Sequence, residues 1–125
     1  MQSVKVQTNE ETFLEELYIE LEKIRNFSMQ RSVLEGEDLV VRNLDNGSEV
    51  IIELKSAGRY GELPISTIIP LAGRVRSDLC AKKIILVSFS NLPNLLLSKL
   101  NELGVQSVTN PTVDKVVKKV QTALG

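Results

Sequence analysis

Hydrophobic residues recur every three or four positions in four stretches of the chain, a spacing typical of amphipathic helices. In the first stretch the apolar residues form one stripe, made of Phe13, Leu14, Leu17, Leu21 and Ile24. Either Asn9 or Thr12 can serve as its N-cap. The other stretches span residues 65–79, 92–103 and 113–124. Pro70 lies inside the second stretch, so we expect it to kink that helix or to delay its start.

Short apolar and β-branched runs between these stretches predict strands at residues 29–34, 39–42, 50–54, 83–88 and 105–108. Asn46-Gly47 is a strong hairpin signal, so the first strands are expected to form an antiparallel meander. The continuous apolar run from Ile84 to Val87 is typical of a strand that is covered on both faces. The element order αβββαβαβα predicts an α/β fold with a central mixed sheet flanked by helices.

Length and composition describe an ordinary globular protein. The 125 residues suit a single domain, 1–125. Hydrophobic residues make up 42% and charged residues 25%, and no apolar run approaches the roughly 18 residues that span a bilayer. The N-terminus lacks the apolar stretch of a secretory signal, and Cys80 is the single cysteine. We therefore expect a cytoplasmic protein with no membrane association.

The residue types that are missing restrict the chemistry. The chain contains no histidine and no pair of cysteines, which excludes histidine-based catalysis and zinc sites. Oxygen ligands remain, and these suit magnesium, manganese or calcium. Glu53 and Lys55 lie two positions apart on one predicted strand and so share a face. The hairpin through Asn46-Gly47 can bring Asp38, which opens the preceding strand, beside Glu53.

These three residues and the order of the elements resemble the PD-(D/E)xK, or restriction-endonuclease-like, nuclease superfamily. Its core is αβββαβ, with an acid on the second strand and acid-x-lysine on the third. Glu37 stands where the superfamily has its proline. In organisation, small archaeal Holliday-junction resolvases are the most similar members.

The resemblance implies a metal-dependent nuclease, a Mg²⁺-dependent endodeoxyribonuclease that hydrolyses phosphodiester bonds in DNA. Asp38, Glu53 and the backbone carbonyl of Leu54 would bind Mg²⁺ or Mn²⁺, and Lys55 would orient or help to deprotonate the attacking water. A first-helix acid near the metal recurs in relatives, and Glu20, at the edge of the apolar stripe, is our candidate for it. A homodimer is expected from the resemblance and from the two-fold geometry of duplex DNA.

A locally basic segment is the candidate DNA-binding surface. Its members are Arg59, Tyr60, Arg74, Arg76, Lys82 and Lys83. The net charge of -1 and the pI near 5.5 do not add to this signal, because nucleic-acid-binding proteins usually carry a basic excess.

Other interpretations stay open at this point. Glu53 and Lys55 can be a solvated strand face, and Glu20 a solvated helix edge. A nuclease-like fold can serve as an inactive module that binds nucleic acid or protein, an alternative that the low net charge favours. The second half also resembles the end of a response-regulator receiver domain, although no strand with paired acids precedes the first helix.

Overall fold

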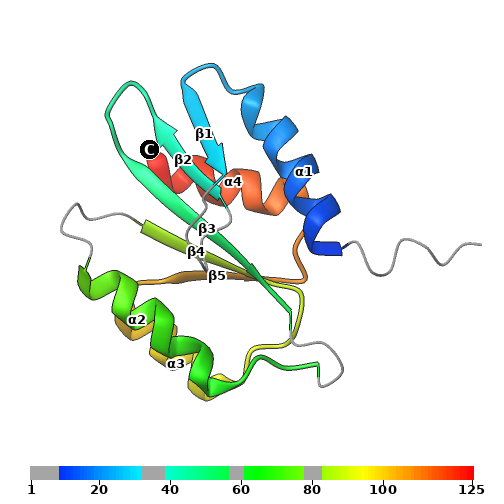
Figure 1. Cartoon of the computed structure of the whole chain (residues 1–125), viewed down its shortest axis with the longest axis vertical. Coiled ribbons are helices and arrows are strands. Elements are labelled where there is room, and N and C mark those ends of the chain that lie inside the picture. The colour runs from blue at the N-terminus through cyan, green and yellow to red at the C-terminus, as the bar shows by residue number, and fades with distance from the viewer. Residues whose placement is uncertain (1–8, 32–38, 57–60, 78–82) are drawn as a thin grey trace, which may run out of the picture.

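A computed structural model describes residues 9–31, 39–56, 61–77 and 83–125, and of residues 9 and 74–77 it describes the backbone alone. The sheet has five strands in the spatial order β1-β2-β3-β4-β5 (Figure 1). β1 (Phe27–Arg31), β2 (Leu39–Asn43) and β3 (Glu49–Lys55) are antiparallel neighbours. β4 (Lys83–Ser88) and β5 (Gln106–Thr109) continue the sheet parallel to β3. The predicted mixed sheet is confirmed, and the antiparallel meander contradicts the receiver-like alternative, whose sheet would be wholly parallel.

Helices cover both faces of the sheet. α1 (Asn9–Glu22) and α4 (Val113–Leu124) lie on one face, and α2 (Ile68–Ser77) and α3 (Asn94–Leu103) lie on the other (Figure 1). The element order αβββαβαβα is confirmed, with a short 3-10 helix, η3 (Ile65–Thr67), before α2. None of the described helices is long and apolar enough to cross a membrane.

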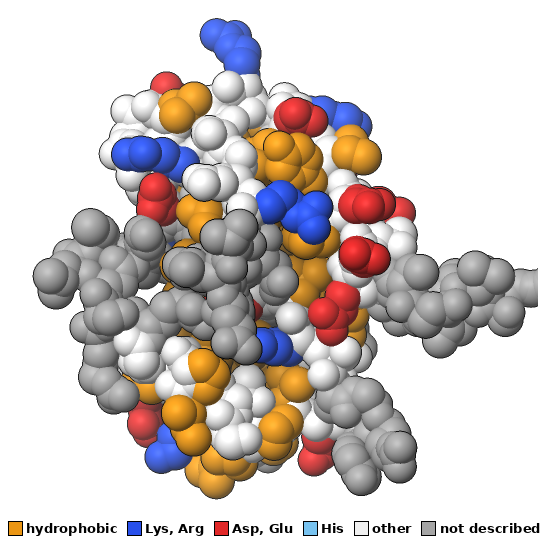
Figure 2. Space-filling view, viewed as in Figure 1, with side chains coloured by type: hydrophobic (Ala, Val, Ile, Leu, Met, Phe, Trp, Pro, Cys, Tyr) orange, Lys and Arg blue, Asp and Glu red, His pale blue; other side chains and the backbone are white. Residues whose placement is uncertain are grey.

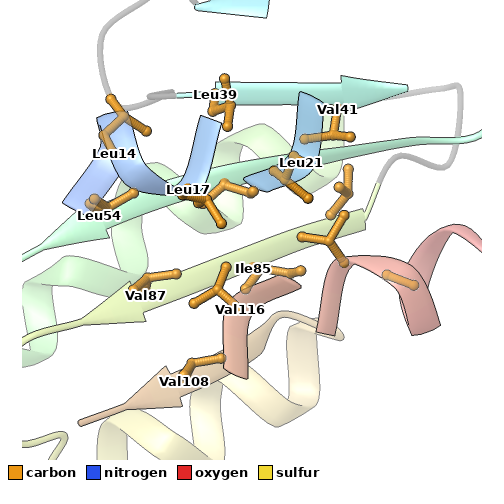
Figure 3. Packing of buried hydrophobic residues seen from close by; sticks show 14 of the residues in the cluster. Leu14, Leu17, Leu21, Leu39, Val41, Leu54, Ile85, Val87, Val108 and Val116 are labelled. Atoms are coloured by element: carbon orange, nitrogen blue, oxygen red, sulfur yellow. The ribbon is translucent and has the colours of Figure 1, made fainter. Parts of the chain in front are cut away.

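Each face of the sheet buries its own hydrophobic core. Side chains of α1 and α4 pack on Leu39, Val41, Leu54, Ile85 and Val87 (Figure 3). The opposite core joins Ile51, Ile84 and Leu86 to α2 and α3. Because residues 50 to 54 of β3 are all buried, β3 is a central strand with helices on both sides.

Several element boundaries differ from those expected. α1 begins at Asn9, so Asn9 is its first residue and Thr12 lies within it, and neither of the two expected residues precedes the helix as an N-cap. Pro70 is the third residue of α2, in the first turn, where its missing N–H has no intrahelical partner to lose. Its effect is thus to delay the start of the helix. Gly104 ends α3 in the left-handed conformation, with φ 79°, as its sequence position predicted.

The carboxyl end of α4 is held by side chains from the β2–β3 hairpin. The last carbonyl groups of a helix have no intrahelical donor and need one from elsewhere. Asn43 Nδ2 and Asn46 Nδ2 each donate to Leu124 O at 3.1 Å. Lys83 Nζ donates to Ala123 O at 2.6 Å. The hairpin therefore joins the last helix to the strand meander.

Replacing Asn43 by alanine is expected to lower the free energy of unfolding by about 1–3 kcal/mol. Asn43 is 5% exposed, and the change removes its hydrogen bond to Leu124 O and those that its side-chain oxygen accepts from Asp45 N and Asn26 Nδ2. Urea denaturation measures the effect. Asn101→Ala, at an exposed position of α3, is the matched control and should change stability by no more than about 0.5 kcal/mol. Equal stability of the two variants would contradict the capping role.

Candidate functional site

Glu53 is a carboxylate inside the central strand of the sheet. Its neighbours Ile52 and Leu54 belong to the core under α1 and α4, so strand alternation directs Glu53 to the α2/α3 face. Glu53 pairs with Leu86 of β4 in the ladder and is only 1% exposed. Burying an ionised carboxylate costs several kcal/mol unless nearby charge or hydrogen bonds offset it. The solvated strand face considered from the sequence is therefore wrong for Glu53.

Lys55 ends β3 on the same face as Glu53. It is half-buried, and it pairs with the fully buried Ser88 at the end of β4. The backbone of Lys55 is fixed, because its carbonyl oxygen accepts from Phe89 N at 2.9 Å. Ser88 Oγ in turn donates to Ser90 O at 2.5 Å and accepts from Ser90 N at 3.1 Å. The carboxyl ends of β3 and β4, held by these hydrogen bonds, carry an acid and a lysine. We call this end of the sheet the Lys55 edge.

Glu10, in the first turn of α1, reaches this edge from the neighbouring helix. Ser56 Oγ donates to Glu10 Oε2 at 2.8 Å, and Ser56 directly follows Lys55. The connectivity explains the contact. β1 is parallel to β3, since each is antiparallel to β2, and α1 leads into β1 through a short turn. α1 therefore runs in the reverse direction, with its first turn beside the end of β3.

Glu20 is not brought to this edge. It lies ten residues after Glu10 on α1, about 15 Å along the helix axis. Its carboxylate pairs with Lys23 at 2.9 Å, and its side chain is 44% exposed. The sequence argument placed Glu20 by its angle around the helix, whereas helix direction decides which turn meets β3. The signal for Glu10 was in the predicted element order, which already fixed that direction.

The donor atoms at the edge suit a hard divalent cation. The Glu53 carboxylate and the Leu54 carbonyl are oxygen ligands of the kind that Mg²⁺ and Mn²⁺ prefer. Within the described ranges, no three acidic or cysteine side chains gather closely enough to hold a metal ion. Asp38, the remaining predicted ligand, lies outside those ranges.

Comparison with known proteins identifies the fold. No protein-family model matches the sequence, and no curated protein matches it significantly. Among solved structures, this fold is similar to that of a repair endonuclease from Pyrococcus abyssi, with a TM-score of 0.51 and 20% identity over 81% of this chain and 47% of that one. EndoMS in complex with double-stranded DNA gives a TM-score of 0.51 and 21% identity over 82% and 45%. The fold is nuclease-like.

A third similar structure is protein VC1899 from Vibrio cholerae, with a TM-score of 0.55 and 18% identity over 90% of this chain and 31% of that one. This chain therefore spans less than half the length of each of the three proteins. At these identities the similarity is one of fold.

The nuclease-like fold separates the predicted DNA-binding residues. Lys83 opens β4 opposite Val50, whereas Lys55 pairs with Ser88 at the other end of the same two strands. About 16 Å of strand separates these ends. Lys83 is therefore not part of the Lys55 edge, and its ammonium caps α4 instead.

Of the other predicted DNA-binding residues, the structure describes at most the backbone. Arg74 and Arg76 lie on α2, which covers the same face of the sheet as Glu53, but their side chains are outside the description. Arg59, Tyr60 and Lys82 lie outside the described residues altogether.

Charge is unevenly distributed over the nuclease-like fold. Exposed acidic side chains gather along α1 (Figure 2), and they are Glu10, Glu11, Glu15, Glu16 and Glu22. A polyanion such as DNA is repelled by this surface. Any nucleic acid therefore has to approach the Lys55 edge from a side other than the exposed face of α1.

Proposed function

We propose that this chain is the nuclease-like domain of a metal-dependent DNA endonuclease, with Asp38, Glu53 and Lys55 as its active-site residues. One observation carries the proposal: a carboxylate that is 1% exposed and a half-buried lysine share one face at the carboxyl end of the central strand. Stability alone does not favour an acid at a buried strand position, whereas a cation site uses one.

Asp38 enters the proposal through its sequence position. It directly precedes Leu39, and Leu39 pairs with Ile52, the residue before Glu53, in the antiparallel ladder. Paired residues in such a ladder have their Cβ atoms about 5 Å apart. In the proposal, the carboxylate of Asp38 would be the second acidic ligand beside Glu53.

The chain's own residues would divide the work as follows. Asp38, Glu53 and the Leu54 carbonyl would hold Mg²⁺ or Mn²⁺. When bound, the ion supplies positive charge that polarises the scissile phosphodiester. Lys55, its backbone fixed by Phe89 N, would orient the attacking water and stabilise the negative charge that develops on the phosphate.

DNA is the proposed substrate because of the names of two similar structures. One is called a repair endonuclease, and EndoMS was solved with double-stranded DNA. The acidic surface of α1 favours the alternative, an inactive nuclease-like module that binds protein. Metal binding separates the two proposals, since only the enzyme needs a cation at Glu53. The homodimer stays a prediction, and light scattering of the purified protein tests it.

Manganese titration by calorimetry, together with cleavage of labelled duplex and four-way-junction DNA, tests the proposed function. We expect the wild type to bind Mn²⁺ and to cleave at least one of the two substrates. Asp38→Asn should lose both properties, while Glu49→Gln, at the opposite end of β3, should keep them. A wild type that binds no Mn²⁺ would overturn the enzyme and favour the inactive module.

Two acids of α1 should respond differently to removal. We expect Glu10→Gln to weaken Mn²⁺ binding severalfold, because it removes a negative charge that lies beside Ser56, the residue directly after Lys55. Glu20→Gln should leave the affinity within about twofold, because it is distant from that segment and paired with Lys23. Calorimetry on both variants measures the difference. A larger effect at Glu20 would restore the assignment made from the sequence.

A further inference from the structure

A basic hollow lies between α4 and the edge strand β5. Its volume is about 550 Å³, and it is lined by residues 106–108 of β5 and by Lys115, Lys118, Lys119 and Thr122 of α4. We call it the lysine groove. The three lysines are spaced i, i+3 and i+4 along α4 and therefore share one side of the helix.

Among the described residues, no carboxylate neutralises the charge of the lysine groove. No acidic residue lines it, and none of its lysines forms an ion pair with a carboxylate in the described part of the chain. Between α4 and α1 lies a hollow of the opposite sign, lined by Glu16, Glu20 and Asp114. A chain with a net charge of only -1 thus carries separate positive and negative surfaces on either side of one helix. The positive one fits a polyanion.

The strand in the lysine groove adds backbone donors. β5 is last in the strand order, so no described strand pairs with its outer edge (Figure 1). Outward N–H groups of an edge strand can donate to phosphate oxygens. Pairing with an acidic peptide strand is less well supported, because β5 has only four residues and Asn110, with φ 46°, bends the chain directly after it. Phosphate contacts need no such continuous ladder.

One end of the lysine groove lies near the Lys55 edge, the end of the sheet where the strands finish and the candidate active site lies. Lys55 pairs with Ser88, and Ser88 pairs with Thr109 at the end of β5. Adjacent strands are about 4.8 Å apart, so the backbone of Thr109 lies about 10 Å from that of Lys55 across the sheet. The Lys55 side chain is on the α2/α3 face and α4 is on the other, so a bound strand reaches Lys55 around the carboxyl ends of the strands. Lys115 Nζ donates to Asn110 O at 2.9 Å, which places the first lysine of the row at this same edge.

An aromatic hollow adjoins the first lysine. Phe13, Phe89, Asn110 and Pro111 line a space of about 430 Å³, and the two phenylalanine rings meet edge to face with centroids 5.3 Å apart. Asn110 is thus common to this hollow and to the contact made by Lys115. Aromatic surface beside a cationic row is the combination with which proteins hold a nucleic-acid strand.

We propose that the lysine groove binds the phosphate backbone of a nucleic-acid strand and guides it to the edge that carries Lys55. The proposed binding is argued from the residues of the groove alone. The guiding role rests on the proposed nuclease function. Lys118 and Lys119 contact successive phosphates beside α4, and Lys115 contacts the phosphate nearest to the aromatic hollow. None of these residues belongs to the basic segment that the sequence indicated.

Fluorescence anisotropy with labelled duplex and single-stranded DNA, in Ca²⁺ and over a range of salt concentrations, tests the binding site. The variant Lys115→Gln/Lys118→Gln/Lys119→Gln should bind at least about tenfold more weakly at 0.1 M salt. Its slope of log K against log salt should be smaller in magnitude by about 2 to 3, one unit for each lost phosphate contact. The control is Arg25→Gln/Arg31→Gln/Lys99→Gln, which removes the same charge at exposed positions elsewhere and should keep the wild-type slope.

The outcomes test the binding site separately from the proposed enzyme. Equal losses in the two triple variants, or no loss in the lysine variant, would overturn the groove as a binding site even if the wild type cleaves DNA. Weaker binding in the lysine variant alone supports the groove, even if the wild type cleaves nothing with Mn²⁺. Binding of a polyglutamate peptide to the groove in the absence of any DNA binding would assign it to an acidic protein and overturn the proposal.

Discussion

Glu53→Gln is expected to lower the rate of metal-dependent DNA cleavage by a factor on the order of 10²–10³ or more, the scale seen when one charge-stabilising group is lost from an active site. Glutamine has the size and shape of glutamate, so the strand and both cores stay intact. Only the negative charge is lost, and with it the strongest described ligand for a divalent cation.

The Glu53→Gln experiment needs two readouts. Single-turnover cleavage measures the rate, and Mn²⁺ calorimetry should show that the affinity is lost with it. Glu49→Gln is the matched control on the same strand: Glu49 is half-buried near Arg42, with 3.9 Å between their charged atoms, at the opposite end of β3. Thermal melting should show that both variants are folded. Cleavage by Glu53→Gln at the wild-type rate would remove Glu53 from the active site.

Lys55→Met is expected to lower cleavage by about 10²-fold or more while Mn²⁺ affinity changes by less than about threefold. Methionine keeps an unbranched apolar side chain at this half-buried position but has no ammonium group. The proposed role of Lys55 lies in water orientation and charge stabilisation, and neither is needed to hold the cation. The two effects should therefore separate.

Lys99→Met, at an exposed position of α3, is the control for removal of a positive charge and should cleave normally. Lys55→Arg is a second informative variant, because it keeps the charge but replaces a compact ammonium by a planar group. Partial recovery with arginine would support a charge role. A parallel loss of metal affinity and cleavage in Lys55→Met would show instead that Lys55 shapes the cation site.

Local patterns were enough to predict the elements and their order. Helical spacing and short β-branched runs depend on neighbours a few residues apart, and the hairpin signal at Asn46-Gly47 is equally local. The structure confirms the antiparallel pairing of β2 and β3 and the burial of Ile84 to Val87 on both faces of the sheet. Strand alternation also placed Glu53 and Lys55 on one face, because that relation spans only two residues.

Contacts between segments that are distant in the sequence could not be predicted from local patterns. The sequence favoured Glu20 over Glu10 because the angle around a helix can be read from spacing, whereas the end of α1 that meets β3 depends on chain direction. Lys83 was predicted to contact DNA because other basic residues lie near it in the sequence. In the fold it is a helix cap, at the end of β4 away from Lys55.

The sequence by itself determined the nuclease-like order of elements, the absence of histidine chemistry, and the pairing of an acid and a lysine on one strand face. Only the tertiary structure decided that Glu53 is buried, that Glu10 contacts Ser56, and that three lysines of α4 meet the edge of β5. The physical reason is how far apart in the sequence the interacting residues lie. Periodicity and turn chemistry act over a few residues, while burial and charge segregation depend on packing between segments tens of residues apart.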